Sequence, residues 1–226
     1  MFYTEYPSMY LNRLIDLVKP NAYMTCFSKT YFNSAMWGHY ADNHKGVCLI
    51  FDHSLIDSFK KNVIDVEGFY ETQYSSKVIN LNFFLLIRYD DDHLDFWYKD
   101  SKNNKKCFLY GMRFNKEWIK KYDDICKSMY TKKTIDWSYE EEARAIIFDH
   151  NYKFSNDKSR KVLYQPNKLK GIIFGTNTSV SDKLKVLGIL KNKKSVLNDQ
   201  FKIYQAYFSK INGETKINIH QVDIDF

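Results

Sequence analysis

Short apolar runs bounded by polar residues constrain the fold of this chain more than any other feature of its sequence. Residues 22–28, 46–51 and 142–148 each have the length and the residue types of a β-strand. Glycines bound a fourth run, at residues 171–175. Large apolar side chains recur every three or four positions over residues 114–129, which is the spacing of an amphipathic helix. Strands mixed with such a helix predict an α+β protein.

Further segments extend this pattern. Residues 63–75 are expected to form another strand, and residues 82–99 a helix followed by a loop. The run at 46–51 is apolar at every position after its glycine, which is typical of a central strand covered on both faces. A second amphipathic helix is expected from about Ser179, because apolar side chains again recur at helical spacing. Its inward-facing residues are expected to be Val180, Leu184, Leu187 and Leu190.

The C-terminal part of the chain carries its strongest turn signal. Asn212-Gly213 separates two strand-like segments, and both central residues of a type I′ hairpin turn need a positive φ. No repeat and no Pro/Ser-rich linker divides the chain. We therefore expect a single α+β domain over residues 1–226, with a mixed, mostly antiparallel sheet, flanking helices and a C-terminal β-hairpin. Residues 1–21, where Ser8 caps a short helix that Pro20 ends, read as an atypical N-terminal helical extension.

The composition excludes several classes of protein. The chain has 226 residues and 44% of them are hydrophobic, so it can bury a core. It contains only 8 Gly and 3 Pro, which excludes a disordered or fibrous chain. No apolar run approaches the ~18 residues that a membrane span needs, and the start of the chain does not resemble a secretory signal. We expect a cytoplasmic protein that does not enter the membrane.

Cysteine and acidic residues give no metal-binding pattern, so no metal is expected. Cys26, Cys48, Cys107 and Cys126 are scattered, without the paired spacing of a zinc site. Cys26 and Cys48 are expected to be small buried hydrophobic side chains, since both lie in strand-like runs. The acidic run Asp90-Asp91-Asp92 beside His93 reads as a solvated loop, because adjacent side chains point in different directions.

The first segment that could carry chemistry directly precedes the run at 46–51. It places Trp37, His39 and Tyr40 within four residues, and such positions at strand ends often line clefts. The alternative is structural: the Trp and Tyr rings would fill the core, with their polar tips hydrogen-bonded.

The second such segment combines aromatic, acidic and basic residues. Trp137 and Tyr139 precede Glu140, Glu142 and Arg144. In an extended backbone Glu140, Glu142 and Arg144 project from one face. On a solvated face this row is a charge ladder of little energetic consequence. In a cleft, Arg144 would hold one carboxylate ionised while the other carboxylate would take a raised pKa.

The order of these motifs resembles that of a prokaryotic family catalogued as domain of unknown function twenty-nine seventy-one. The resemblance runs from about residue 22 to the C-terminus. The family's usual opening, a strand with Tyr, Lys and Arg followed by an Asn-Asp-Pro turn, is not apparent in residues 1–21. The motifs that carry the resemblance are Cys26-Phe27-Ser28, Met36-Trp37-x-His39-Tyr40-Ala41, Gly46-Val47-Cys48, Trp137-x-Tyr139-Glu140-x-Glu142-x-Arg144 and Lys170-Gly171-Ile172-Ile173-Phe174-Gly175.

A His-Tyr pair beside one strand and a Glu at the start of a later one are also loosely similar to the site of ADP-ribosyltransferases. This analogy favours an enzyme that uses NAD as a substrate, either a transferase or a glycohydrolase, in a toxin or an antiviral defence effector. Glu142 is then the first choice, and Glu140 the second, for the carboxylate that stabilises an oxocarbenium-like transition state. Tyr40 or Trp37 would stack on nicotinamide, His39 would hydrogen-bond a ribose hydroxyl, and Arg144 would orient the carboxylate or bind a phosphate. Trp137 and Tyr139 would complete the substrate-binding surface.

Two other functions remain open from the sequence. Lys and Arg number 34 against 27 Asp and Glu, a net charge of +7, and lysine pairs alternate with Tyr and Phe. That composition suits a non-catalytic module that senses a nucleic acid or a ligand. A metal-dependent nuclease acting through Glu140, Glu142 and an aspartate is the second alternative.

Overall fold

The computed structural model describes residues 21–55, 66–80, 102, 115–149, 156, 158, 160–161 and 163–224. It contains helices, antiparallel strands and a mixed sheet, so the α+β class is confirmed. The chain forms two compact units. The first contains Met1–Ala22, Thr72–Ile135 and Phe148–Tyr152, and the second contains Tyr23–Glu71, Asp136–Ile147 and Lys153–Phe226.

A three-stranded sheet belongs largely to the second unit, with the strand order β1-β6-β3. Its strands are β1 (Asn21–Ser28), β6 (Glu142–Asp149) and β3 (Val66–Glu71), which confirm the predicted strands in these regions. β3 and β6 are antiparallel and pair Phe69 with Ala145. Because side chains alternate along a strand, Ala145 and Ile147 face an apolar cluster that includes Leu55, whereas Glu142 and Arg144 project from the opposite face.

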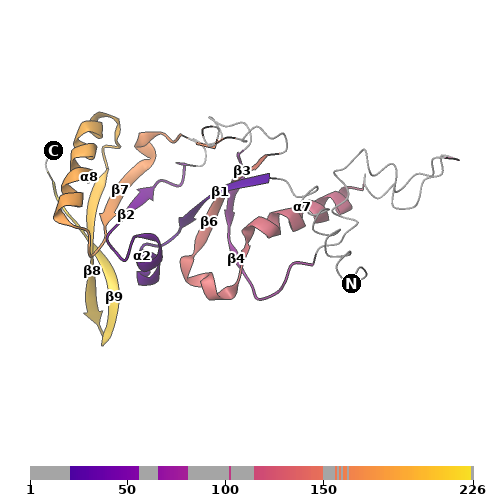
Figure 1. Ribbon diagram of the computed structural model, residues 1–226, viewed down its shortest axis with the longest axis horizontal. Coiled ribbons are helices and arrows are strands. Elements are labelled where there is room, and N and C mark those ends of the chain that lie inside the picture. The colour runs from indigo at the N-terminus through magenta and orange to yellow at the C-terminus, as the bar shows by residue number, and fades with distance from the viewer. Residues whose placement is uncertain are drawn as a thin grey trace, which may run out of the picture. The chain divides into compact units, whose positions relative to one another are not determined.

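A four-stranded sheet in the same unit has the order β2-β7-β8-β9 (Figure 1). Its strands are β2 (Val47–Phe51), β7 (Leu169–Phe174), β8 (Lys202–Ile211) and β9 (Glu214–Gln221). β7 pairs antiparallel with β2 and parallel with β8, and β8 pairs antiparallel with β9. The prediction that 46–51 is a central strand is wrong, because β2 is the edge strand of this sheet among the described residues and Leu49 is 49% exposed. The central apolar strand is β7 instead.

Helices cover both faces of the four-stranded sheet. Ile173 of β7 packs with Trp37 of α2 (Ser34–Tyr40), while Ile172 packs on the other face with Leu190 of α8 (Val180–Lys193). This helix makes the crossover that a parallel β7–β8 pair requires. The predicted inward stripe of α8 is only half correct, since Leu187 and Leu190 pack inward but Val180 and Leu184 are exposed. Short 3₁₀ helices are η2 (Ile135–Glu140), η3 (Pro166–Lys168) and η4 (Lys194–Val196).

The predicted C-terminal hairpin is confirmed. Asn212 and Gly213 both have positive φ, 52° and 81°, and they connect β8 to β9 as a two-residue turn. Only the first residues of β8 pair with β7, so the hairpin projects beyond the rest of its sheet (Figure 1).

The described part of the first unit is built around α7 (Lys116–Thr131), which confirms the predicted long amphipathic helix. Asn115 caps it by accepting hydrogen bonds from the backbone of Glu117 and Trp118. Cys126, Tyr130 and Thr131 are buried among its described side chains. After the helix, β5 (Lys132–Lys133) pairs in parallel with β4 (Gln73–Tyr74).

The cysteines depart in part from the sequence prediction. Cys26 is exposed, because it lies on the face of β1 opposite the Phe27 side chain, so its predicted burial is wrong. Cys48 is half-buried, and its burial raises the pKa of the thiol to about 11. Cys107, the predictions for residues 1–20 and 82–99, and the acidic run beside His93 lie outside the described residues.

Candidate functional site

The two predicted segments meet at a hydrogen bond between side chains a hundred positions apart. Tyr40, the last residue of α2, donates from Oη to Oε1 of Glu140 at 2.8 Å. Glu140, the last residue of η2, is only 2% exposed, whereas Tyr40 is 65% exposed. The pair therefore presents a phenol to solvent with a buried carboxylate behind it.

Backbone contacts fix this meeting point. The side chain of Asn33 caps α2 through its oxygen, and its Nδ2 donates to the carbonyl of Tyr139 at 3.0 Å. Ser28, at the end of β1, donates from Oγ to the carbonyl of Glu140 at 2.8 Å. The start of α2 and the end of β1 thus both hold the end of η2. These two hydrogen bonds restrict how far the Tyr40–Glu140 pair can separate.

A left-handed residue separates the two candidate carboxylates. Glu141 has φ 43°, and its N–H donates to the carbonyl of Ser138, so the chain leaves η2 and enters β6 through one reversed residue. Glu140 is consequently not extended. The prediction that Glu140, Glu142 and Arg144 form one row is wrong for Glu140, although Glu142 and Arg144 do share a face of β6.

Glu142 and Arg144 form a buried, two-pronged ion pair. Arg144 donates from Nε to Glu142 Oε1 at 3.0 Å and from Nη2 to Oε2 at 2.8 Å. The Arg144 side chain is only 12% exposed and that of Glu142 only 7%, so the interpretation of these residues as a surface charge ladder is wrong. Both oxygens of Glu142 are engaged by the guanidinium, and breaking such a pair leaves an uncompensated buried charge. Tyr70 lies opposite Arg144 in the ladder with β3.

Three rings form an aromatic group beside the Tyr40–Glu140 pair. His39 lies 6.4 Å from both Trp137 and Tyr139, and the two latter rings are 6.0 Å apart, measured between centroids. Trp137 is 38% exposed and His39 is also exposed. Each ring belongs to the segment that carries Tyr40 or Glu140, so one structural junction positions all five side chains.

Trp37 is placed away from this group. It is 3% exposed, it packs against Ile173 and Ala206, and its Nε1 donates to the carbonyl of Tyr31 at 2.8 Å. The ring anchors α2 to the four-stranded sheet, which corresponds to the structural alternative considered for this residue.

The left-handed loop that connects α2 to β2 was not predicted from the sequence. Asp42, Asn43 and His44 are consecutive left-handed residues, with φ of 44°, 53° and 67°. Asp and Asn tolerate this conformation better than most residues, and that was the available signal. Gly175, at the end of β7, buttresses the loop: its N–H donates to the carbonyl of Gly46 at 3.0 Å, and a Cβ there would overlap the carbonyl oxygen of His44.

Within the described ranges, no group of three or more His, Cys, Asp or Glu side chains is arranged to hold a metal ion. Among the described residues, no helix has the length and apolar character to cross a membrane.

These features define an α+β protein with a candidate site made by a helix end, a 3₁₀ helix and the strand that follows it. Residues 36–145 match the model of the family described as protein of unknown function (DUF2971), which confirms the resemblance drawn from the motifs. The matched range contains Tyr40, Glu140, Glu142 and Arg144. No curated protein and no solved structure matches the chain.

Proposed function

We propose that this protein is a glycosyl-transfer enzyme that cleaves NAD or a similar dinucleotide, in the manner of an ADP-ribosyltransferase or an NAD glycohydrolase. The observation that carries the proposal is the hydrogen bond between Tyr40 and Glu140, 2.8 Å long, beside the exposed aromatic group. The Glu140 carboxylate and the aromatic rings together supply an acidic group and stacking surfaces at one place.

The chemistry requires stabilisation of positive charge on a ribose. When the bond between ribose C1′ and the nicotinamide nitrogen breaks, its electron pair leaves with nicotinamide and the sugar becomes oxocarbenium-like. Water or an acceptor then attacks C1′ and loses a proton. A negative charge held near the ribose lowers the energy of that state.

The geometry favours Glu140 over Glu142 for this role. Arg144 already binds both oxygens of the Glu142 carboxylate. Glu140 instead accepts a hydrogen bond from the Tyr40 hydroxyl, and the Tyr40 side chain is open to solvent. In the proposed complex Tyr40 contacts the ribose hydroxyl, and Glu140 behind it keeps the phenol oxygen electron-rich. Glu140 is then a positioning residue, because it acts through Tyr40. Arg144 neutralises the buried charge of Glu142 on β6.

The aromatic group supplies a binding surface for the bases. In the proposed complex nicotinamide or adenine stacks on Trp137 and Tyr139, whose rings lie 6.0 Å apart, and His39 hydrogen-bonds a ribose hydroxyl. Trp37 has no part in this surface, since its ring lies in the core.

The test is release of nicotinamide from NAD, measured with the wild-type protein and two conservative variants. Tyr40→Phe removes only the hydroxyl, and Glu140→Gln keeps a hydrogen-bond acceptor while removing the charge. Each is expected to lower the rate by about 100-fold or more, the usual effect of losing one such group.

Tyr207→Phe is the matched control, because Tyr207 is an exposed tyrosine on β8, outside the candidate site. It should release nicotinamide at the wild-type rate. Full activity in Glu140→Gln and Tyr40→Phe, or no release by the wild-type protein with any acceptor tried, would exclude this function for the site.

A further inference from the structure

The edge of the four-stranded sheet that β9 forms is open to a further strand. The N–H of Val222 donates to the carbonyl of Ile203 at 2.8 Å, and this bond sets the alternation of the antiparallel β8–β9 ladder. The N–H and C=O groups of every second residue of β9 therefore point away from β8. No hydrogen bond from the described part of the chain reaches these outward groups. They belong to Thr215, Ile217, Ile219 and Gln221.

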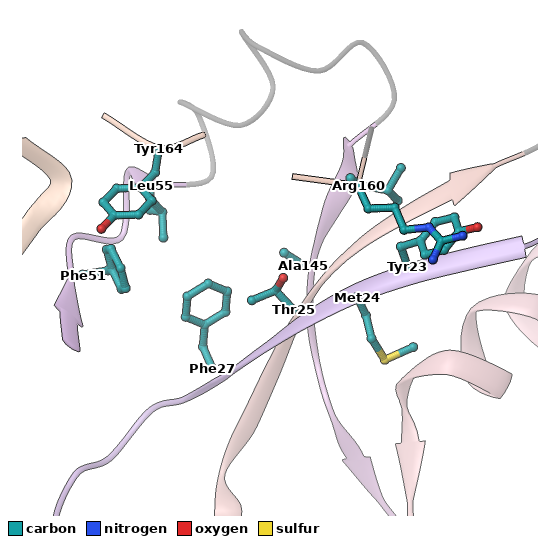
Figure 2. Close-up of a pocket in the computed structure, with 10 residues that line it drawn as sticks. Tyr23, Met24, Thr25, Phe27, Phe51, Leu55, Ala145, Arg160 and Tyr164 are labelled. Atoms are coloured by element: carbon teal, nitrogen blue, oxygen red, sulfur yellow. The ribbon is translucent and has the colours of Figure 1, made fainter. Parts of the chain in front are cut away.

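Other edges of this sheet are less accessible. At the β2 end, Phe51 packs edge to face against Phe27 of β1 and against Tyr164, with ring centroids 6.1 and 5.1 Å away (Figure 2). Where β8 extends beyond β7, the side chain of Gln205 donates from Nε2 to the carbonyl of Ala206 at 2.8 Å. β9 therefore offers the more accessible row of backbone donors and acceptors.

The side chains of β9 do not protect its edge. Edge strands commonly carry unpaired lysines, which repel a second strand. β9 has one lysine, Lys216, and its Nζ lies 2.9 Å from Oε2 of Glu214, so its charge is balanced within the strand. An open and charge-balanced edge is a template for strand addition.

From this pattern we infer that two copies of the chain associate through β9, as an antiparallel pair with a two-fold axis at Asn218. This register places Ile217 opposite Ile219 of the second copy, and Thr215 opposite Gln221 of the second copy. Every outward residue then exchanges hydrogen bonds with an outward residue of the second copy. A shift of two residues in either direction would place an isoleucine opposite Thr215 or Gln221, so the sequence of β9 favours this register.

The proposed dimer joins two four-stranded sheets into one continuous sheet. It uses the strand edge and none of the side chains proposed for NAD cleavage, so it is independent of that function. Sedimentation velocity of the full-length protein from about 1 to about 300 µM tests it, because weak protein contacts dissociate in this range. The wild-type protein should be a monomer at the lower concentration and a dimer at the higher one.

A change of charge at His220 tests the register. His220 is exposed, and in the proposed dimer it lies opposite Lys216 of the second copy. His220→Glu should lower the dissociation constant by about tenfold and His220→Lys should raise it by about tenfold, because the two-fold axis repeats the contact. Asn192→Glu and Asn192→Lys are the matched controls, since they make the same charge changes at an exposed position of α8. At about 0.15 M salt each should change the dissociation constant by less than about twofold.

Amide hydrogen exchange at the two ends of the concentration range shows which edge is used. The N–H of Ile219 should exchange about tenfold more slowly in the concentrated sample, because the second copy protects it. The N–H of Leu49 also points outward, from β2, since Gly46 and Gly175 form a hydrogen-bonded pair of that ladder. Its exchange should not depend on concentration.

One proline substitution removes an outward donor alone. Gln221→Pro deletes an N–H that makes no bond to β8, so the variant should fold, as urea unfolding verifies, and remain a monomer. A wild-type monomer at every concentration would overturn the inference. So would a dimer that is as stable in folded Gln221→Pro, or one that responds equally to the His220 and Asn192 variants. If Gln221→Pro does not fold, the His220 and Asn192 variants decide.

Discussion

At the scale of single residues, the candidate site depends on one backbone reversal. Glu141 adopts φ 43°, a conformation that costs a non-glycine residue about 1 kcal/mol or more. The reversal lets Glu140 point toward Tyr40 while Glu142 points toward Arg144. A regular strand through Glu141 would have put both carboxylates in the same row.

This geometry predicts that Glu141→Gly stabilises the protein. Glycine adopts a left-handed conformation without strain, so the free energy of unfolding should rise by about 0.5 to 1 kcal/mol after the entropic cost of glycine is subtracted. Urea denaturation measures it. Glu214→Gly, at an exposed position of β9, makes the same replacement in extended backbone and should lower stability by about 0.5 to 1 kcal/mol. A loss of stability in both variants would contradict the role given to Glu141.

At the scale of elements, the loop between α2 and β2 sets where the Tyr40 helix ends. Its residues Asp42, Asn43 and His44 are held by the end of β7: the N–H of Asn177 donates to the carbonyl of His44 at 3.0 Å. Gly175 lies so close to His44 that only a residue without a side chain fits. The end of the central apolar strand thus supports the helix that carries the exposed phenol.

A matched pair of glycine substitutions tests this support. Gly175→Ala should lower the free energy of unfolding by about 2 kcal/mol or more, because its Cβ would overlap backbone that has no room to shift. Gly188→Ala, in the interior of α8 with nothing within 4 Å of the added Cβ, should instead raise stability by up to about 1 kcal/mol. Thermal or urea unfolding distinguishes the two signs, and a neutral Gly175→Ala would show that the loop is not held there.

At the scale of the whole molecule, the net charge of +7 predicts weak, non-specific affinity for nucleic acid. Fluorescence anisotropy of a single-stranded oligonucleotide should show binding at about 50 mM salt that falls steeply by about 200 mM. If the aromatic group stacks a base, Trp137→Ala weakens this binding by about 1 kcal/mol or more, whereas the exposed Tyr207→Ala does not. An oligonucleotide affinity that does not change with salt concentration would contradict an electrostatic origin of the binding.

The family resemblance, the α+β class and several elements could be predicted from the sequence. The amphipathic spacing around Trp118 and the Asn212-Gly213 turn are local signals, since each depends on neighbouring residues whose geometry the backbone imposes. The position of β2 in its sheet was predicted wrongly, because apolar content does not reveal which strands pair. The exposure of Val180 and Leu184 was missed for a similar reason: helical spacing gives a stripe but not its direction.

For the candidate site, too, some features follow from the sequence and others only from the tertiary structure. The sequence alone determined which side chains are available, and that Glu142 and Arg144 share a face, because alternation along a strand needs only the covalent backbone. Only the tertiary structure decided that Glu140 leaves that row, that Tyr40 reaches it and that Glu142 is buried against Arg144. Those outcomes depend on contacts across a hundred positions and on one left-handed residue, and the packing that selects them comes from the rest of the fold.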